Sequence, residues 1–315
     1  MAEFLTFDIG GTKIASAFVR LPEEGDAPVV LLRDEIPTCA AEGGDAVRER
    51  LMEFSYQQLQ LAGEHGIVPR GIGIAAAGVP DSKTGEIISA TDLLPGWKGQ
   101  QIYQALHQVT DLPVYMVGDV VAHGLGEAQY GAGRTSRIML SIGVGTGIGG
   151  AIIIGGQPFF GTHGMAGHAG HVASPLGVGV LCSCGTTQGH IEPVASGTGL
   201  ATLYNMRTDG SQVHNGGEVA ALANDGDETA ISVIKDSAHT LGVCIGGMAN
   251  LIDPDGIVVS GSVTKAGADW WSALRIGYRE SALPLLRDVQ LREGELGGDA
   301  PLIGAAVAAS QTINC

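Results

Sequence analysis

The sequence predicts a two-lobed α/β protein with a cleft between the lobes. Its 315 residues make a length that is usually divided between about two domains. Apolar runs rich in Ile, Val and Phe alternate with segments in which apolar residues recur at helical spacing. A strand, glycine turn and strand over residues 4–19 occurs again over residues 137–154. We interpret both as the start of a repeated βββαβα unit, although two glycine hairpins can also arise independently.

In the first half of the chain, strands alternate with helices. Val47, Leu51 and Phe54 recur at helical spacing, and Gly66 is a suitable residue to end that helix. The run from Gly71 to Gly78 is typical of a buried strand that ends on a glycine turn. The expected strands are residues 4–9, 14–19, 29–35, 71–78 and 114–117, and the expected helices are residues 45–62 and 120–129.

The second half begins with the repeated hairpin and ends with a helix. Its expected strands are residues 137–142, 151–154 and 256–260, and its expected helices are residues 228–252 and 303–310. We expect residues 1–119 to form the smaller N-terminal lobe and residues 120–302 the larger C-terminal lobe. The last segment, residues 303–315, should pack back on the N-terminal lobe.

Charge and composition exclude several classes of protein. Against 33 Asp and Glu the chain has 17 Lys and Arg, a net charge of −16, which disfavours binding to nucleic acid or an anionic membrane. Residues 1–19 contain Asp8 and Lys13 and resemble no signal peptide, and no charge-free run approaches the roughly 20 residues of a membrane span. Five cysteines, an odd number, indicate reduced thiols in the cytoplasm.

The first glycine turn has the residue types that hold phosphates. Asp8 ends a strand and is suited to hold Mg²⁺ directly or through water. Gly10 and Gly11 let backbone N–H groups approach phosphate oxygens without a Cβ clash. Thr12 can donate its hydroxyl to phosphate, and Lys13 can supply a positive charge. The alternative is an ordinary β-hairpin turn, for which Gly-Gly is a common choice.

The second glycine turn can hold phosphates in the same way. Gly145, Thr146 and Gly147 again combine glycines with a hydroxyl. The pattern is neither the Walker motif, whose lysine and serine are missing, nor the dinucleotide-binding motif, whose glycine spacing differs. Gly261, in the turn after the expected strand 256–260, is a further candidate for the nucleotide site.

Three stretches together resemble one family. The residues Asp8-Ile9-Gly10-Gly11-Thr12-Lys13, Gly145-Thr146-Gly147-Ile148-Gly149-Gly150 and the segment 167–192 look like the ROK family, which contains sugar kinases and repressors. The resemblance spans nearly the whole chain. It implies the actin-like ATPase fold, with two RNase H-like lobes that close around a sugar and ATP, and it favours a homodimer.

The resemblance also implies a catalytic base at Asp119. In ROK kinases an aspartate at a strand end takes the proton from the sugar hydroxyl that attacks the γ-phosphate of ATP. A helix N-cap is the alternative role, since Asp119 directly precedes the expected helix 120–129, and both roles can coexist. The sequence departs from the family just before this residue, where Gly118 replaces an asparagine that contacts the sugar in many relatives.

Cysteines and histidines cluster in a short loop, a combination that suits tetrahedral Zn²⁺. Relatives typically supply one histidine and three cysteines. Here a histidine, with one residue inserted before it, replaces the third cysteine. The expected ligands are His171, Cys182, Cys184 and His190. The alternative is a pair of ordinary thiols, and a His190 that points away would leave the site incomplete.

The same segment carries the expected sugar contacts. His168-Ala169-Gly170-His171 resembles the His-x-Gly-His loop of bacterial N-acetylmannosamine kinases, whereas glucokinases of the family have glutamate at the first position. His171 would then serve both the metal and a sugar hydroxyl, and Glu192 would accept hydrogen bonds from the sugar. Asp92, in a loop that ends in Pro-Gly-Trp, is either a hydroxyl acceptor or a solvated turn residue, just as His168 can be an ordinary loop residue.

The sequence therefore predicts an ATP-dependent sugar kinase that uses Mg²⁺ and a structural Zn²⁺. Its expected reaction is phosphorylation of the 6-hydroxyl of N-acetylmannosamine, with a glucokinase or another hexose kinase as the alternative. A sugar-sensing repressor is disfavoured, because Asp8 lies in the first strand and leaves no room for a preceding helix-turn-helix. A catalytically silent sugar-binding module is disfavoured because both turns and both aspartates are present. Polyphosphate remains an alternative phosphoryl donor.

Overall fold

The computed structural model describes residues 1–23, 26–91, 93–185, 188–209 and 212–313. Contacts within the chain define two compact units. Unit 1 comprises Met1–Arg134, Gly156–Met165 and Gly298–Cys315, and unit 2 comprises Thr135–Gly155 and Ala166–Gly297.

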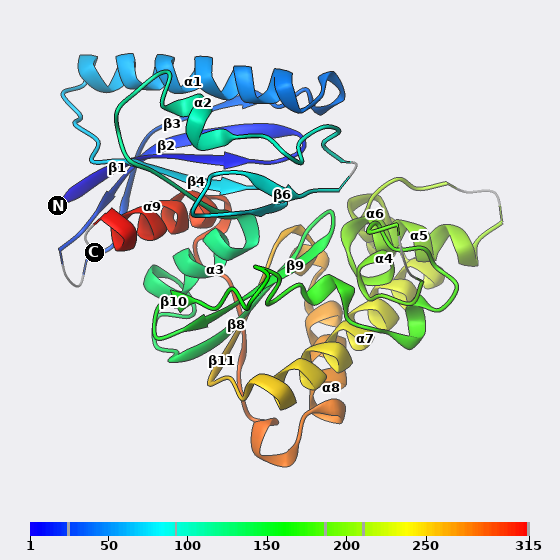
Figure 1. The fold of residues 1–315 in the computed structure, drawn as a ribbon. Coiled ribbons are helices and arrows are strands. Elements are labelled where there is room, and N and C mark those ends of the chain that lie inside the picture. Colours follow the sequence, from blue (N-terminus) through cyan, green and yellow to red (C-terminus); the bar gives the residue numbers. More distant parts are fainter. Residues whose placement is uncertain (24–25, 92, 186–187, 210–211, 314–315) are drawn as a thin grey trace. The chain divides into compact units, whose positions relative to one another are not determined.

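The sheet of unit 1 has the strand order β3-β2-β1-β4-β7 (Figure 1). Antiparallel pairing joins β1 (Ala2–Ile9) to β2 (Lys13–Leu21) and β2 to β3 (Val29–Pro37). Two further strands, β4 (Ile72–Ala76) and β7 (Val114–Gly118), run parallel to β1. The five strands expected in this half of the chain are confirmed, and their ends shift by a few residues.

Helices cover both faces of this sheet. On one face α1 (Gly44–Glu64) buries an apolar side that includes Phe54, whose ring meets that of Phe7 edge to face at 5.8 Å. On the other face lies α9 (Ala300–Ile313), which contacts β1, β4 and β7 (Figure 1). Beneath α9 packs α3 (Asp119–Tyr130), so closely that a Cβ added at Gly304 would lie 1.6 Å from the carbonyl oxygen of Ala122. Glycine is therefore required at this helix crossing.

Unit 1 also contains small elements that the sequence pattern did not predict. They are β5 (Val79–Pro80), β6 (Ile87–Ser89) and α2 (Ile102–Leu106). Between β6 and α2 lies Trp97, which is fully buried and donates its indole N–H to the carbonyl oxygen of Ala77 at 3.0 Å. These short elements escaped prediction because they are too short to show a periodic pattern.

The second sheet repeats the topology of the first. Its order is β10-β9-β8-β11-β12, built from β8 (Ile138–Val144), β9 (Ile148–Ile154), β10 (Gln157–Pro158), β11 (Gly256–Ser260) and β12 (Leu291–Glu293). In both sheets the first strand lies at the centre, with the second strand antiparallel to it and the third beyond the second on one side, and two parallel strands on the other side. The repeated unit inferred from the sequence is thus confirmed.

A helical layer completes unit 2. The long helix α7 (Glu228–Ile252), whose bounds match the expectation, packs against α8 (Ala268–Ser281). Glycines allow the close approach, since a Cβ on Gly242 would lie 2.0 Å from the carbonyl oxygen of Leu274. Helix α8 was not predicted, nor were three shorter helices, α4 (Glu192–Ala195), α5 (Gly197–Arg207) and α6 (Gly216–Asn224).

The division of the chain differs from the expected lobe boundary after residue 119. Helix α3 belongs to unit 1, because it packs against α9, and a Cβ on Gly126 would lie 2.5 Å from the carbonyl oxygen of Ala300. The C-terminal helix packs on the sheet of unit 1.

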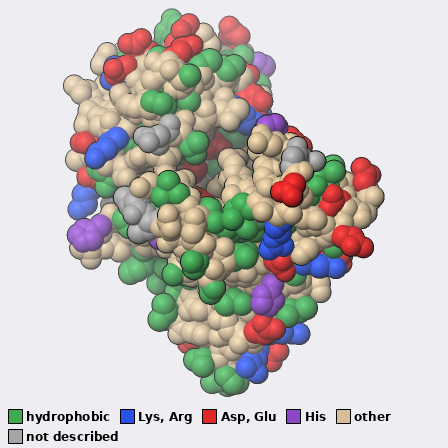
Figure 2. Space-filling model, turned by 90° about the vertical axis from the view of Figure 1, so that its right-hand side faces the viewer, with side chains coloured by type: hydrophobic (Ala, Val, Ile, Leu, Met, Phe, Trp, Pro, Cys, Tyr) green, Lys and Arg blue, Asp and Glu red, His purple; other side chains and the backbone are tan. Residues whose placement is uncertain are grey.

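Within the described part of the chain, every helix is too short or too polar to cross a lipid bilayer. On the face shown in Figure 2, Lys and Arg side chains lie singly or in small groups among acidic ones, in keeping with the net charge of −16.

Candidate functional site

Two aspartates, Asp8 and Asp119, lie at the same edge of the first sheet. Their strands β1 and β7 flank β4 and run parallel to it, so that Ile9, Ala76 and Gly118 stand in one row. Asp8 is one residue before this row and Asp119 one residue after it. Ligands of α/β proteins usually bind at the carboxyl ends of parallel strands. The fold thus brings together two carboxylates that are 111 residues apart in the chain, from 119 − 8 = 111.

Burial and mutual repulsion change the acidity of both aspartates. Burial raises the pKa of Asp119 to about 6, against the opposing effect of the hydrogen bond from the Val120 N–H. Burial likewise raises the pKa of Asp8 to about 7, and the negative charge of Asp119 raises it further. Because Asp119 loses its proton first, its charge opposes the ionisation of Asp8. The nearby cations Lys13 and Arg33 lower the pKa of Asp8 but do not cancel these effects.

The aspartate pair fits a divalent cation. Two partly buried carboxylates that repel each other are costly when both are ionised, and a cation between or beside them would offset that cost. Mg²⁺ prefers one or two carboxylates together with water and phosphate oxygens. Asp8 is thus the carboxylate of the pair that would hold Mg²⁺, with the charge of Asp119 beside it.

Asp119 also contacts the start of helix α3. Its Oδ1 accepts a hydrogen bond from the Val120 N–H at 2.8 Å. The N-cap position itself belongs to Gly118, which has extended backbone angles, and Asp119 is the first helical residue. The carboxylate therefore contributes to the helix terminus by its charge rather than as the N-cap residue.

The first glycine turn leaves backbone donors available. It is closed by the Gly10 N–H, which donates to the carbonyl oxygen of Lys13 at 3.0 Å. The N–H groups of Gly11 and Thr12 have no hydrogen-bond partner within the described residues, and both residues are exposed. The expected charge of Lys13 is partly compensated, because its Nζ lies 2.6 Å from Oε2 of Glu35. This ion pair is about half exposed, so it is worth little in water.

The second glycine turn, between β8 and β9, has a similar arrangement. The Gly145 N–H donates to the carbonyl oxygen of Gly147 at 2.9 Å. Across the described ranges, the N–H groups of Thr146 and Gly147 have no hydrogen-bond partner. Gly261 directly follows β11 with a φ of 108°, and a Cβ there would lie 2.3 Å from the carbonyl oxygen of Val144. Backbone geometry alone therefore requires glycine at residue 261.

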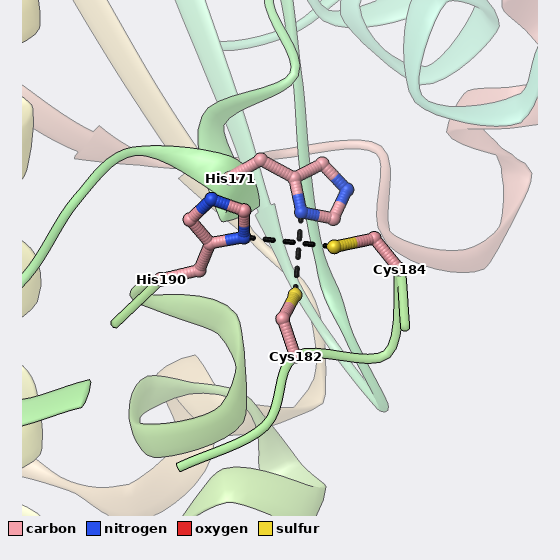
Figure 3. A group of neighbouring side chains, drawn as sticks. All are labelled: His171, Cys182, Cys184 and His190. Atoms are coloured by element: carbon pink, nitrogen blue, oxygen red, sulfur yellow. Dashed lines mark hydrogen bonds between the residues drawn. The ribbon is translucent and has the colours of Figure 1, made fainter. Parts of the chain in front are cut away.

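The four expected metal ligands converge on one point (Figure 3). One ligand atom from each of His171, Cys182, Cys184 and His190 lies within 4.8 Å of the others. Nδ1 of His171 is 3.4 Å from Sγ of Cys182, and Nδ1 of His190 is 3.8 Å from Sγ of Cys184. Tetrahedral Zn²⁺ with bonds of about 2.0–2.3 Å would separate its ligand atoms by about 3.3–3.8 Å. The donor set and its spacing thus fit zinc, with His190 turned towards the other three residues.

Backbone pairing holds the loop that carries these ligands. Ala173 forms an isolated antiparallel bridge with His190, and Leu181 forms one with Gln188. Gly177 packs beneath this pairing, where a Cβ would lie 2.2 Å from the carbonyl oxygen of His190. In its described part the segment is therefore held by backbone pairing, and Val172, Leu176 and Val180 also pack against the apolar core of unit 2.

Glu192 links the loop of the metal ligands to the second glycine turn. Its Oε2 accepts a hydrogen bond from the Ile148 N–H, at the end of the turn, at 3.0 Å. Its Oε1 accepts a hydrogen bond from Ser183, which lies between Cys182 and Cys184 in sequence. The first residue of α4 thus connects the metal loop to the turn through its two carboxylate oxygens.

The expected sugar-binding residues fall into three groups. In unit 2 the ring of His168 stacks on that of His171, with 6.2 Å between centroids and 20° between planes. Glu192 is also in unit 2, and its carboxylate is used within the protein as described above. Asp119 is in unit 1. Asp92 lies outside the described residues, so its expected role was not located.

Some residues around the two turns were not singled out from the sequence. They are Thr38, Ser183, Ser196 and Thr198, and each hydrogen-bonds to a turn or to a residue that contacts one. The Ser-Gly-Thr-Gly run at 196–199 carries a readable signal, because serine before small residues is typical of a helix N-cap. The residues around Thr38 give no such sequence signal, since its hydrogen-bond partner Gly10 is 28 residues away in the chain.

The sequence is similar to those of known proteins along nearly its whole length. The model of the ROK family matches residues 4–312. A glucokinase of Halalkalibacterium halodurans is 32% identical over 329 aligned residues, covering 99% of this chain and 96% of its own length. An N-acetylmannosamine kinase of Escherichia coli is 33% identical over 307 aligned residues, covering 97% of each chain.

A solved structure has the same fold. A ROK family glucokinase from Streptomyces griseus, crystallised in complex with glucose and AMPPNP, superimposes with a TM-score of 0.77 at 28% sequence identity. The alignment covers 98% of this chain and all of that one.

Proposed function

Because this chain belongs to the ROK family, with its actin-like ATPase fold, we propose that it transfers the γ-phosphoryl group of ATP to the 6-hydroxyl of a hexose. The observation that carries the proposal is the pair of carboxylates at the edge of the first sheet, Asp8 and Asp119. In this proposal Asp119 supplies a base and Asp8 a ligand for the cation. These are the two groups that phosphoryl transfer chiefly requires.

In this proposal Asp119 is the general base. Its pKa of about 6 leaves it mostly ionised at neutral pH, yet basic enough to accept a proton from a sugar hydroxyl as that hydroxyl attacks phosphorus. Helix α3 holds the carboxylate through the Val120 N–H, so that the side chain has few rotamers to lose when substrate binds.

Asp8 is the proposed ligand of Mg²⁺, which would neutralise charge on the phosphates. The ion favours the ionised form of Asp8, whose pKa is about 7 when no cation is present. Cation binding at this carboxylate therefore releases a proton near neutral pH.

The two glycine turns are the proposed phosphate-binding groups. Each presents two backbone N–H groups that no described residue uses, Gly11 and Thr12 in one and Thr146 and Gly147 in the other. Such groups bind anions through hydrogen bonds and add no negative charge of their own. The AMPPNP bound to the Streptomyces griseus relative supports a nucleotide as donor.

We propose N-acetylmannosamine as the acceptor, with glucose as the alternative. His168 and His171 support the first sugar through their His-x-Gly-His pattern, and the relatives named above include kinases of both sugars. Since Nδ1 of His171 faces Cys182, its Nε2 is the atom proposed to meet a sugar hydroxyl. Glu192 is the proposed acceptor for a second hydroxyl.

The metal cluster is proposed to hold Zn²⁺ in a structural role. Zinc would supply rigidity to the loop that carries His171. We propose a reducing compartment such as the cytoplasm, which the free thiols of the proposed ligands support. We further propose a homodimer, by analogy with the family.

An ADP-release assay tests the function. Purified protein would be mixed with ATP, Mg²⁺ and one sugar at a time: N-acetylmannosamine, glucose, mannose, N-acetylglucosamine or fructose. The proposal predicts ADP release that requires sugar, with the largest kcat/KM for N-acetylmannosamine. Tight sugar binding with no ADP release from ATP, and no turnover with polyphosphate, would indicate a sugar-sensing regulator instead.

A further inference from the structure

Both glycine turns receive hydrogen bonds on their carbonyl oxygens from a threonine outside the turn. We propose that Thr38 and Thr198 are positioning residues, which hold the free N–H groups of the two turns in the direction that phosphate binding requires. This inference rests on the proposed function, because it assigns the turns to a nucleotide.

Thr38 holds the first turn. It follows β3, is fully buried, and donates twice: its hydroxyl to the carbonyl oxygen of Gly10 at 2.6 Å and its N–H to that of Thr12 at 2.9 Å. Its own carbonyl oxygen accepts from Nη1 of Arg50, on α1, at 2.6 Å. The turn is thus tied through Thr38 to the helix that covers the sheet.

Thr198 holds the second turn. It is the second residue of α5, and its hydroxyl donates to the carbonyl oxygen of Thr146 at 2.8 Å. The preceding N–H, of Gly197, donates to the carbonyl oxygen of Gly145 at 2.7 Å. The first residues of α5 therefore bind the carbonyl oxygens of Gly145 and Thr146. These two residues directly precede the free N–H groups of Thr146 and Gly147.

A serine extends this arrangement into a chain of hydrogen bonds. Oγ of Ser196 accepts from the Gly199 N–H at 3.0 Å and lies 3.0 Å from Oγ1 of Thr198. Since the hydroxyl hydrogen of Thr198 is directed at Thr146, the hydroxyl hydrogen between the two side chains must come from Ser196. Successive hydrogen bonds polarise one another, which strengthens the last donor in the chain.

Peptide geometry explains why these contacts matter for a ligand. In a planar trans peptide the C=O of one residue points opposite to the N–H of the next, so fixing the carbonyl fixes the amide. The carbonyl of Gly10 shares its peptide with the N–H of Gly11, and that of Thr146 shares its peptide with the N–H of Gly147. These are donors that no described residue uses. Each threonine hydroxyl therefore sets the direction of one free donor.

The alternative is that the threonines only stabilise two surface loops. That role predicts a lower melting temperature with no particular effect on nucleotide binding. The positioning role predicts a loss of nucleotide affinity that exceeds any loss of sugar affinity.

Four variants separate these roles. Thr38→Val and Thr198→Val keep the shape of the side chain and remove the hydroxyl, and Thr38→Ser and Thr198→Ser keep the hydroxyl. For each protein the Kd of AMPPNP with Mg²⁺, the Kd of N-acetylmannosamine and the melting temperature would be measured. Removal of one hydrogen bond worth about 1–2 kcal/mol should weaken AMPPNP binding by about 5–30-fold. We expect sugar binding to change less than about twofold and the serine variants to restore the nucleotide affinity.

The outcomes distinguish this inference from the proposed function. Suppose that the wild-type protein binds AMPPNP. If the valine variants then bind AMPPNP equally well, or lose affinity for AMPPNP and sugar in parallel, the positioning role alone is overturned. Wild-type protein that binds no nucleotide overturns both. Thr198 is exposed, so Thr198→Val should fold and decides the question even if Thr38→Val at the buried site does not.

Discussion

Asp119 raises the pKa of Asp8 across a single intervening strand. Asp8 is the second-last residue of β1, and Asp119 directly follows β7 on the other side of β4. The charge of the residue that ionises first opposes the ionisation of the other. The two aspartates therefore differ in their degree of ionisation at the same pH. The first two predictions concern this pair.

Replacing Asp119 with asparagine should remove the base and keep the binding groups. We expect kcat to fall by about 10²–10⁴-fold, the usual contribution of a general base. The Kd for sugar should remain within a few-fold of that of the wild type, because the amide keeps the shape of the carboxylate. Steady-state kinetics and calorimetry check the two parts, and near-normal turnover would refute the base assignment. Asp111→Asn, at an exposed residue between α2 and β7, is a matched control for loss of one charge.

The aspartate pair predicts a pH dependence of stability in metal-free protein. The pKa of Asp8 is raised from 3.8 to about 7, so between these values the folded protein binds more protons than the unfolded chain. Stability should therefore fall as pH rises through this window, and Asp119, raised to about 6, acts in the same direction. Melting temperatures measured with EDTA across the window should decline less in Asp8→Asn. Mg²⁺ should reverse the decline in wild-type protein, because it binds the ionised carboxylates; a decline that is unchanged in Asp8→Asn would contradict the assignment.

Removal of zinc should loosen the loop of residues 171–190. Chelation should lower the melting temperature and make Cys182 and Cys184 reactive towards a thiol reagent, since no metal then holds them. Metal analysis and thiol titration measure the two effects independently of activity. In His190→Ala we expect weak zinc retention, and in His190→Cys, which restores the family's usual ligand, full retention. A His190→Ala variant that keeps stoichiometric zinc would exclude His190 as a ligand.

The hydrogen bond from Ser183 to Glu192 predicts that the loop carrying the four expected metal ligands affects nucleotide binding. Ser183→Ala should retain zinc, yet it should weaken AMPPNP binding by a few-fold because Glu192 then holds the Ile148 N–H less firmly. Ser174→Ala, in the same loop but without a contact to Glu192, is the control. Equal nucleotide affinity in wild type and Ser183→Ala would show that the two sites are independent.

His168 should influence the choice of sugar. Because glutamate occupies this position in the family's glucokinases, His168→Glu should shift the ratio of kcat/KM for N-acetylmannosamine to that for glucose towards glucose by about tenfold or more. His163→Glu, at an exposed residue of a nearby segment of the sequence, controls for the added charge. An unchanged ratio would assign His168 to the loop structure.

Much of the fold could be predicted from the sequence because its signals are local. Strand β11 and helix α7 were predicted with their observed bounds, since a short β-branched run and a long amphipathic period are each unambiguous. The repeated βββαβα unit was inferred from two glycine hairpins, whereas the order of the strands in each sheet was not predicted. The short elements α2 and α4 to α6 were missed, because brief helices depend on tertiary contacts more than on periodicity. The longer helix α8 was missed as well.

The candidate site was predictable only in part. The four expected metal ligands could be named because a Cys and His cluster in a short segment matches the positions of the family's zinc ligands, and Asp8 because a glycine turn follows it. Asp119 needed the resemblance to a family, since one aspartate before a helix is an ordinary sequence feature. Thr38 and Thr198 were missed because hydrogen bonds to a distant carbonyl leave no pattern in the residue types.

The close crossing of α3 and α9 has a consequence for biosynthesis. Unit 1 is interrupted in sequence by unit 2, and the helix that seats α3 comprises residues 300–313. A ribosome therefore makes β7 and α3, which meet at Asp119, long before it makes their packing partner α9. Since domains fold as units during translation, unit 2 can fold while α3 still lacks its packing surface. The helix that begins at Asp119 gains its packing partner only when nearly the whole chain has emerged, so we expect truncated translation products to lack activity.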